Sequence, residues 1–249
     1  QRGRVGLVLG CVQRCFDPRV NEATVAVLQA NGFEVVIPAH QGCCGAVSHH
    51  QGQLKQTQEL ASDLVQSFSD EALDAVLVAA SGCGHTMKAY GELLDSEGNF
   101  TAPVLDVHEF LAHQGLSESF RQALTPLPCT VAFHDACHMI HGQGIAAQPR
   151  DLLRAIPKLQ LKEATEAGVC CGSAGIYNLV QPDEAAALVQ LKADDLSSTG
   201  AEIVASANIG CSLQLRRYLS QDGPKVEHPM ELLARSAGVG PFSQTHSKA

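Results

Sequence analysis

The sequence predicts an α/β protein built from two duplicated halves, each a parallel sheet covered by helices with cysteine loops at the carboxyl ends of its strands. Two observations predict the duplication: eight of the ten cysteines repeat with one spacing, and the segments beside them repeat as well. A third observation, the alternation of short apolar runs with longer amphipathic segments, predicts the strands and helices. We expect the first half to span residues 1–124 and the second residues 125–249.

The cysteine spacing is the strongest repeat signal. In each series a single cysteine is followed by an adjacent pair and then by another single cysteine, with 31 and 38 residues between them in the first series and 32 and 39 in the second. The series are Cys11, Cys43, Cys44 and Cys83, and Cys137, Cys170, Cys171 and Cys211. The runs AVLVAASGC at 75–83 and IVASANIGC at 203–211 also match, so chance spacing is a poor explanation.

In the first half, residues 5–9 form a short apolar run rich in β-branched residues, which predicts a buried strand. Asp17 and Pro18 predict a helix start, as N-cap and first helical residue, and Asn31-Gly32 predicts the end of that helix. We expect the other elements of this half to be strands at 33–38 and 75–80 and a helix at 51–68.

The second half repeats this alternation after a join at residues 124–129, where Pro126 and Pro128 interrupt the pattern. We expect strands at 130–133 and 201–206, a strand-like run at 159–163 that leads toward Cys170, and helices at 149–156 and 183–196. Alternating strands and helices of this kind are typical of Rossmann-like halves, in which loops at the carboxyl ends of the strands converge on one edge.

Each half would therefore bring four thiolates together, the usual number for an iron–sulfur cluster. Neighbouring glycines would let the backbone approach a bulky inorganic core. Structural zinc is the main rival, since four cysteines also suit a closed tetrahedral site, although adjacent cysteine pairs are less usual there. A thiol–disulfide enzyme is disfavoured because the chain lacks a Cys-x-x-Cys sequence.

Histidines near the same loops are candidates for contacts with a cluster. His134 and His138 flank Cys137 and are the strongest candidates to orient a ligand or donate to a cluster sulfur. Cys15 and Cys129 have no repeat partner, so we interpret both as ordinary cysteines.

Four long segments carry a family resemblance: GCCGAVSHHQG at 42–52, ASGCGHTMKAYGELL at 80–94, CCGSAGIYNLVQP at 170–182 and SANIGCSLQL at 206–215. With the cysteine series, they make the chain resemble the cysteine-rich CCG-domain family. That family includes a heterodisulfide reductase subunit, lactate-utilisation proteins and, closest in local wording, the C-terminal region of the glycolate oxidase iron–sulfur subunit.

The resemblance implies an iron–sulfur electron-transfer subunit of a flavin-dependent glycolate (2-hydroxyacid) oxidase, not catalytic alone, with no catalytic residue identified. All eight repeated cysteines would hold clusters (4Fe-4S or related, at most one per repeat), and zinc could occupy one site. FAD would sit only on a partner flavoprotein subunit. A lactate-utilisation or heterodisulfide-reductase-like subunit and a structural zinc protein remain alternatives.

The chain departs from the family pattern in two ways. Heterodisulfide reductase subunits end each series with a further cysteine, where this chain has Thr86 and Gln214, which disfavours heterodisulfide chemistry. The glycolate oxidase subunit resembles a fusion with a preceding ferredoxin-like domain, which is missing from this chain. We therefore interpret the chain as the C-terminal part of such a subunit.

Composition excludes several other classes. The net charge of −9 and the scattered Lys and Arg residues make nucleic acid a poor partner. With 45% hydrophobic residues but no apolar run long enough for a membrane span, the sequence predicts a soluble protein, cytoplasmic and peripheral to a membrane only through partners. No Gly-x-Gly-x-x-Gly fingerprint follows a strand, so we expect no flavin or nicotinamide on this chain.

Overall fold

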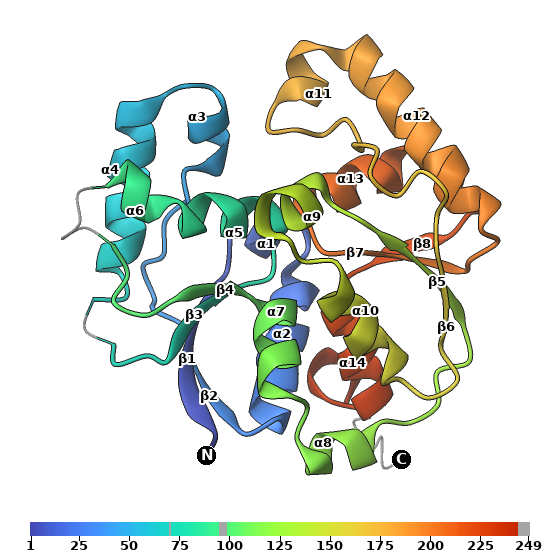
Figure 1. Cartoon of the computed structure of the whole chain (residues 1–249), viewed down its shortest axis with the longest axis horizontal. Helices are drawn as coiled ribbons and strands as arrows, with labels where there is room; N and C mark the ends of the chain where they lie inside the picture. The colour runs from blue at the N-terminus through green and yellow to red at the C-terminus, as the bar shows by residue number, and fades with distance from the viewer. Residues whose placement is uncertain (70, 95–98, 244–249) are drawn as a thin grey trace, which may run out of the picture.

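A computed structural model describes residues 1–69, 71–94 and 99–243 and contains two four-stranded parallel sheets covered by helices. Figure 1 shows the two halves side by side, with the first in blue to green and the second in yellow to red. The predicted α/β class, with two sheet-forming halves, is confirmed. The strands of one sheet lie between residues 3 and 106 and those of the other between residues 130 and 227.

The first half contains β1 Gly3–Val8, α1 Gln13–Phe16, α2 Pro18–Ala30, β2 Phe33–Val36, α3 Ala46–His50, α4 Leu54–Gln66, β3 Ala75–Val78, α5 Ser81–Lys88, α6 Tyr90–Leu93, β4 Val104–Asp106, α7 Val107–Gln114 and α8 Glu118–Ala123. The second contains β5 Thr130–His134, α9 Cys137–Gln143, α10 Ala147–Arg154, β6 Gln160–Lys162, α11 Tyr177–Val180, α12 Pro182–Ser198, β7 Ile203–Ser206, α13 Ile209–Tyr218, β8 Lys225–Glu227 and α14 Pro229–Ala237, followed by a 3₁₀ turn, Gly240–Phe242.

The strand order is β2-β1-β3-β4 in one sheet and β6-β5-β7-β8 in the other, so the duplication extends to topology. In both sheets the order reverses between the two central strands, which are β1 and β3 in the first and β5 and β7 in the second. Such a reversal opens a crevice at the carboxyl ends of the central strands. The topology therefore predicts one crevice in each half, at the carboxyl ends of its two central strands.

The chain deviates from the predicted elements where glycine or short length hides the pattern. The helix predicted at 51–68 is α4, which begins at Leu54, after a turn at Gly52 with a φ of +74°, and ends at Gln66. The short helix α3 before that turn was not predicted. Asp17 precedes α2 as predicted, but its carboxylate accepts a hydrogen bond from Arg216, at 2.6 Å, instead of capping the helix.

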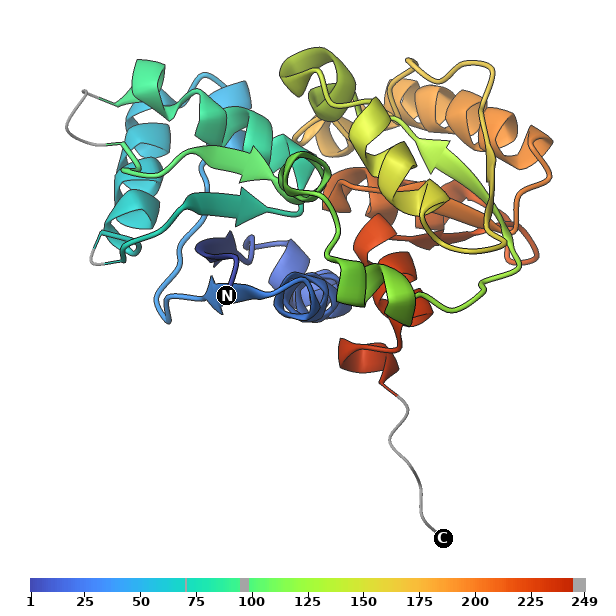
Figure 2. The same cartoon turned by 60° about the horizontal axis from the view of Figure 1, so that its bottom comes forward.

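The two halves share a core. The C-terminal helix α14 packs against α2 of the first half, and α10 packs against α7. Figure 2, turned by 60°, shows the red α14 beside the blue α2. Among the described residues, no helix has both the length and the apolar character needed to cross a bilayer.

Candidate metal centre

All eight cysteines of the two series line one cavity of about 480 Å³. The central strands place them there: Cys11 and Cys83 follow β1 and β3, and Cys137 and Cys211 follow β5 and β7. The adjacent cysteine pairs reach the same cavity from the loops after β2 and β6. All ten cysteines of the chain are free thiols, so every predicted ligand is available to a metal.

Three of these cysteines lie in helices and not in loops. Cys83, Cys137 and Cys211 belong to the first turns of α5, α9 and α13. Backbone N–H groups at a helix start carry partial positive charge, which favours thiolates. The sequence hid these helices because Gly82, Gly84 and Gly210 break the helical pattern.

In the first group, the Sγ atoms of Cys11 and Cys43 lie 3.5 Å apart, and the backbone N–H of Gly45 donates to Cys43 Sγ at 3.4 Å. Cys44 is buried, and the hydroxyl of Tyr90 donates to its carbonyl at 2.7 Å. These contacts fix the adjacent pair from both sides.

The second group repeats this geometry and adds polar partners. The backbone N–H of Gly172 donates to Cys170 Sγ at 3.3 Å, as Gly45 does in the first group. The side-chain amide of Asn208 donates to Cys211 Sγ, also at 3.3 Å. Sequence reasoning missed Asn208, whose repeat equivalent is Ala80.

The thiols perturb one another strongly. A hydrogen bond to Cys43, and then burial, holds the pKa of Cys11 well above its usual range. Cys170 and burial raise the pKa of Cys137 in the same way. Within each group the sulfurs therefore resist ionising together unless a cation compensates their charge. This donor set fits a metal or iron–sulfur centre.

The structure separates the roles of the two predicted histidines. His134 is buried at the end of β5, and burial followed by repulsion from Lys192 lowers its pKa to about 3. His138 lines the cavity, with its ring 4.8 Å from that of His50 and 5.2 Å from that of His85. His138 thus belongs to a stack of histidines between the halves.

The rim of the cavity is apolar and exposed. Phe16 of α1 and Leu179 of α11 are 67% and 73% exposed, and Val12 and Val47 complete the apolar rim. No sequence pattern indicated this rim, because its residues come from three separate segments of the chain. An exposed apolar rim of this kind is typical of a surface that contacts another molecule.

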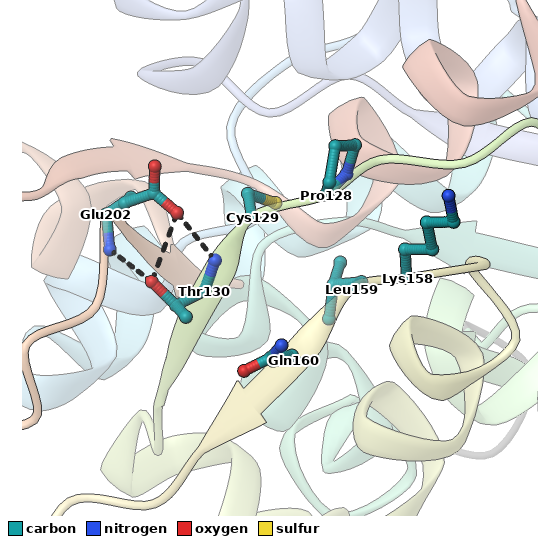
Figure 3. Close-up of a pocket in the computed structure, with 7 residues that line it drawn as sticks. All are labelled: Pro128, Cys129, Thr130, Lys158, Leu159, Gln160 and Glu202. Carbon is teal, nitrogen blue, oxygen red and sulfur yellow. Dashed lines mark hydrogen bonds between the residues drawn. The ribbon is translucent and has the colours of Figure 1, made fainter.

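The two unmatched cysteines lie elsewhere. Cys15 is exposed and does not line the cavity. Cys129 lies in a different pocket of about 440 Å³ at the edge of the second sheet, beside Pro128 and Lys158 (Figure 3). There the carboxylate of Glu202 accepts the backbone N–H of Thr130 at 2.9 Å. No other cysteine lines that pocket among the described residues.

Comparison with known proteins matches the CCG family, described as a cysteine-rich domain, at residues 5–88 and 131–216. The chain is 31% identical to the probable glycolate oxidase iron–sulfur subunit of Bacillus subtilis, over 94% of this chain and 55% of that protein. It is 32% identical to a fumarate reductase (CoM/CoB) subunit of Methanothermobacter marburgensis, over 92% and 46%. The chain therefore spans about half the length of these relatives.

Shorter relatives are covered almost completely. Lactate utilization protein A of Exiguobacterium sp. is 26% identical, over 92% of this chain and 96% of that protein. A hypothetical protein from Helicobacter pylori has a similar crystal structure, with a TM-score of 0.62 at 11% identity, covering 95% of this chain and 49% of that one. At that identity the likeness concerns the fold alone.

Proposed function

The chain belongs to the CCG cysteine-rich domain family, and on this premise we propose that it is an iron–sulfur electron-transfer subunit of an oxidoreductase complex. The observation that carries the proposal is the gathering of eight free thiols in two groups around one cavity. When bound, an iron–sulfur cluster supplies reversible one-electron oxidation and reduction.

Each cysteine series would supply the ligands of one centre. Cys11, Cys43, Cys44 and Cys83 would hold one cluster, and Cys137, Cys170, Cys171 and Cys211 the other. The N–H groups of Gly45 and Gly172 donate to sulfur and stabilise its negative charge. The common cavity keeps the two groups close, which suits electron passage between them.

We further propose that the complex is a flavin-dependent glycolate oxidase. The support is the likeness to the Bacillus subtilis protein and the local wording of the cysteine segments. In that complex a flavoprotein partner would oxidise glycolate, and a ferredoxin-like domain would carry electrons onward. The apolar rim around Phe16 and Leu179 is a suitable contact for such a partner.

A second candidate is a lactate-utilisation subunit. Its support is the likeness to lactate utilization protein A, which is 26% identical over 92% of this chain. Heterodisulfide chemistry is less favoured, because Thr86 and Gln214 stand where the subunits that perform that chemistry carry a further cysteine.

Two measurements test the proposal. Anaerobically purified chain should contain iron and acid-labile sulfide, whereas colourless protein with stoichiometric zinc would contradict an electron-transfer role. Affinity capture of the full-length protein from its native cells should recover a flavoprotein. A substrate panel on the captured complex then distinguishes the candidates, because glycolate but not lactate should reduce a glycolate oxidase.

A further inference from the structure

His134 has an unpaired nitrogen inside the protein. The residue is 1% exposed, and its Nε2 has no hydrogen-bond partner among the residues that the structure describes. Its other ring nitrogen, Nδ1, lies 3.2 Å from Ser206 Oγ. A buried polar atom without a partner costs about 1–3 kcal/mol, so a ligand for Nε2 would remove that cost.

His134 lies beside two of the cysteines. A ring nitrogen of His134 and the Sγ atoms of Cys171 and Cys211 all lie within 4.8 Å of one another, and all three residues are buried. Since Nδ1 is occupied by Ser206, Nε2 is the nitrogen available to a metal shared with the two sulfurs. Imidazole and thiolate ligands occur together in both zinc and iron–sulfur sites.

The duplicated fold provides an internal comparison. In the second sheet His134 pairs with Ser206 in the ladder between β5 and β7. The equivalent ladder of the first sheet, between β1 and β3, pairs Val8 with Val78. The position needs only an apolar residue to complete the fold, because valine fills it in the first half. At this ladder position the second sheet has an imidazole with a hydroxyl partner, where the first sheet has two valines.

We propose that His134 is a metal ligand of the second cysteine group, bound through Nε2 while Nδ1–H donates to Ser206 Oγ. Metal-bound histidines usually donate their other N–H to such a partner, which fixes the ring and its tautomer. The two groups then differ in kind: four thiolates in the first, four thiolates and an imidazole in the second. At an iron–sulfur centre, which rests on the proposed function, the neutral imidazole would add a ligand to the second group without adding negative charge.

Pulsed EPR on the reduced, cluster-containing full chain tests this ligation. We expect a strong nitrogen coupling that changes when the histidines carry ¹⁵N, is lost in His134→Gln and persists in His138→Gln. His138 is the matched control, because it adjoins Cys137 but stacks on other histidines. A wild-type spectrum without strong nitrogen coupling overturns the proposal even if His134→Gln fails to fold, as does coupling that survives His134→Gln.

A zinc experiment separates this inference from the proposed function. Apo chain labelled with [¹⁵N]histidine is loaded with Zn²⁺ and followed by NMR. We expect one Nε2 resonance to shift on loading, and to be missing in His134→Gln; no shift overturns the ligation. Iron and sulfide content judges the electron-transfer role independently. A chain that binds iron and sulfide but lacks nitrogen coupling would keep its proposed function and lose the histidine ligand.

Discussion

The side-chain oxygen of Asn208 accepts the backbone N–H of Gly82 at 2.9 Å, which ties the second half to the first beside the cysteine cavity. The same amide donates to Cys211 Sγ. The backbone adds a further link, because Ser81 N–H donates to the carbonyl of Ala207 at 3.1 Å. One side chain thus couples the junction of the halves to a predicted metal ligand.

Replacing Asn208 should therefore change both stability and redox behaviour. Asn208→Ala leaves the Gly82 N–H unpaired and should cost about 1–3 kcal/mol of unfolding free energy. It also removes a hydrogen bond to sulfur, so the reduction potential of the second group should fall. Asn178→Ala is the control, because Asn178 lines the same cavity but donates to Gln214. An unchanged potential in a redox titration of Asn208→Ala would contradict this role.

The glycine after the second cysteine pair has no room for a side chain. Gly172 has a φ of +75°, and an added Cβ would lie 2.6 Å from the carbonyl oxygen of Ala185. Gly52 has nearly the same φ, +74°, but no described atom lies within 4 Å of its Cβ position. Gly52→Ala should cost about 1 kcal/mol from backbone strain alone. Gly172→Ala should cost more in chemical denaturation and lower the metal content; equal costs would refute the steric explanation.

An ion pair supports the loop that leads to Cys137. Arg150 makes two hydrogen bonds to the buried carboxylate of Asp135, at 2.8 and 2.6 Å. Arg150→Gln should destabilise the protein by about 3 kcal/mol, because it leaves a buried charge without its partner. The exposed pair of Arg154 and Asp151 on the same helix is the control, and Arg154→Gln should cost less than about 1 kcal/mol. Thermal or chemical unfolding measures the loss of stability in both variants. Equal losses would show that the ion pair with Asp135 stabilises the protein no more than the exposed pair does.

His228 should make stability depend on pH. Its Nδ1 accepts the Met230 N–H, so its Nε2–H donates to the carbonyl of Ala79 across the halves, at 2.9 Å. Burial, and then the nearby His108, lowers the pKa of His228 to about 3, from 6.5. The unfolded chain therefore binds the extra proton between these values, so stability is complete above pH 6.5 and falls as the pH decreases.

The pH-dependent loss of stability can be measured by comparing wild type with His228→Asn. Between about pH 7.5 and 5, wild type should lose about 2 kcal/mol of unfolding free energy relative to His228→Asn, which cannot titrate there. Asparagine can still cap α14, so the variant keeps that helix start. Parallel pH profiles of the two proteins in chemical denaturation would show that His228 does not carry this dependence.

The sequence allowed the two repeats to be predicted, but not the contacts between the two halves. Cysteine spacing and matched flanks predicted two equivalent groups because both follow short apolar strands of the same fold. β4 and β8, of three residues each, were not predicted. The packing of α14 on α2 and the single cavity shared by both groups depend on how the halves meet, which leaves no periodic trace.

For His134, too, the sequence predicted a candidate residue but not its contacts. His134 was predicted as a candidate because it lies three residues before Cys137. Its pairing with Ser206, and the lack of a partner for its Nε2 within residues 1–69, 71–94 and 99–243, depend on strand register and burial, which the sequence does not reveal. The division of the chain at residues 124 and 125 and the ligand role of each cysteine remain predictions.

Iron and sulfide content of anaerobically purified cysteine variants decides whether the two thiol groups each hold their own centre. We predict that wild type and Cys129→Ser carry equal amounts, because Cys129 lies in a separate pocket. Cys44→Ser and Cys171→Ser should each lose about half of the iron and sulfide, since each removes one ligand from one group. Wild-type protein without sulfide, or the same loss in Cys129→Ser as in Cys171→Ser, would rule out two cysteine-held iron–sulfur centres.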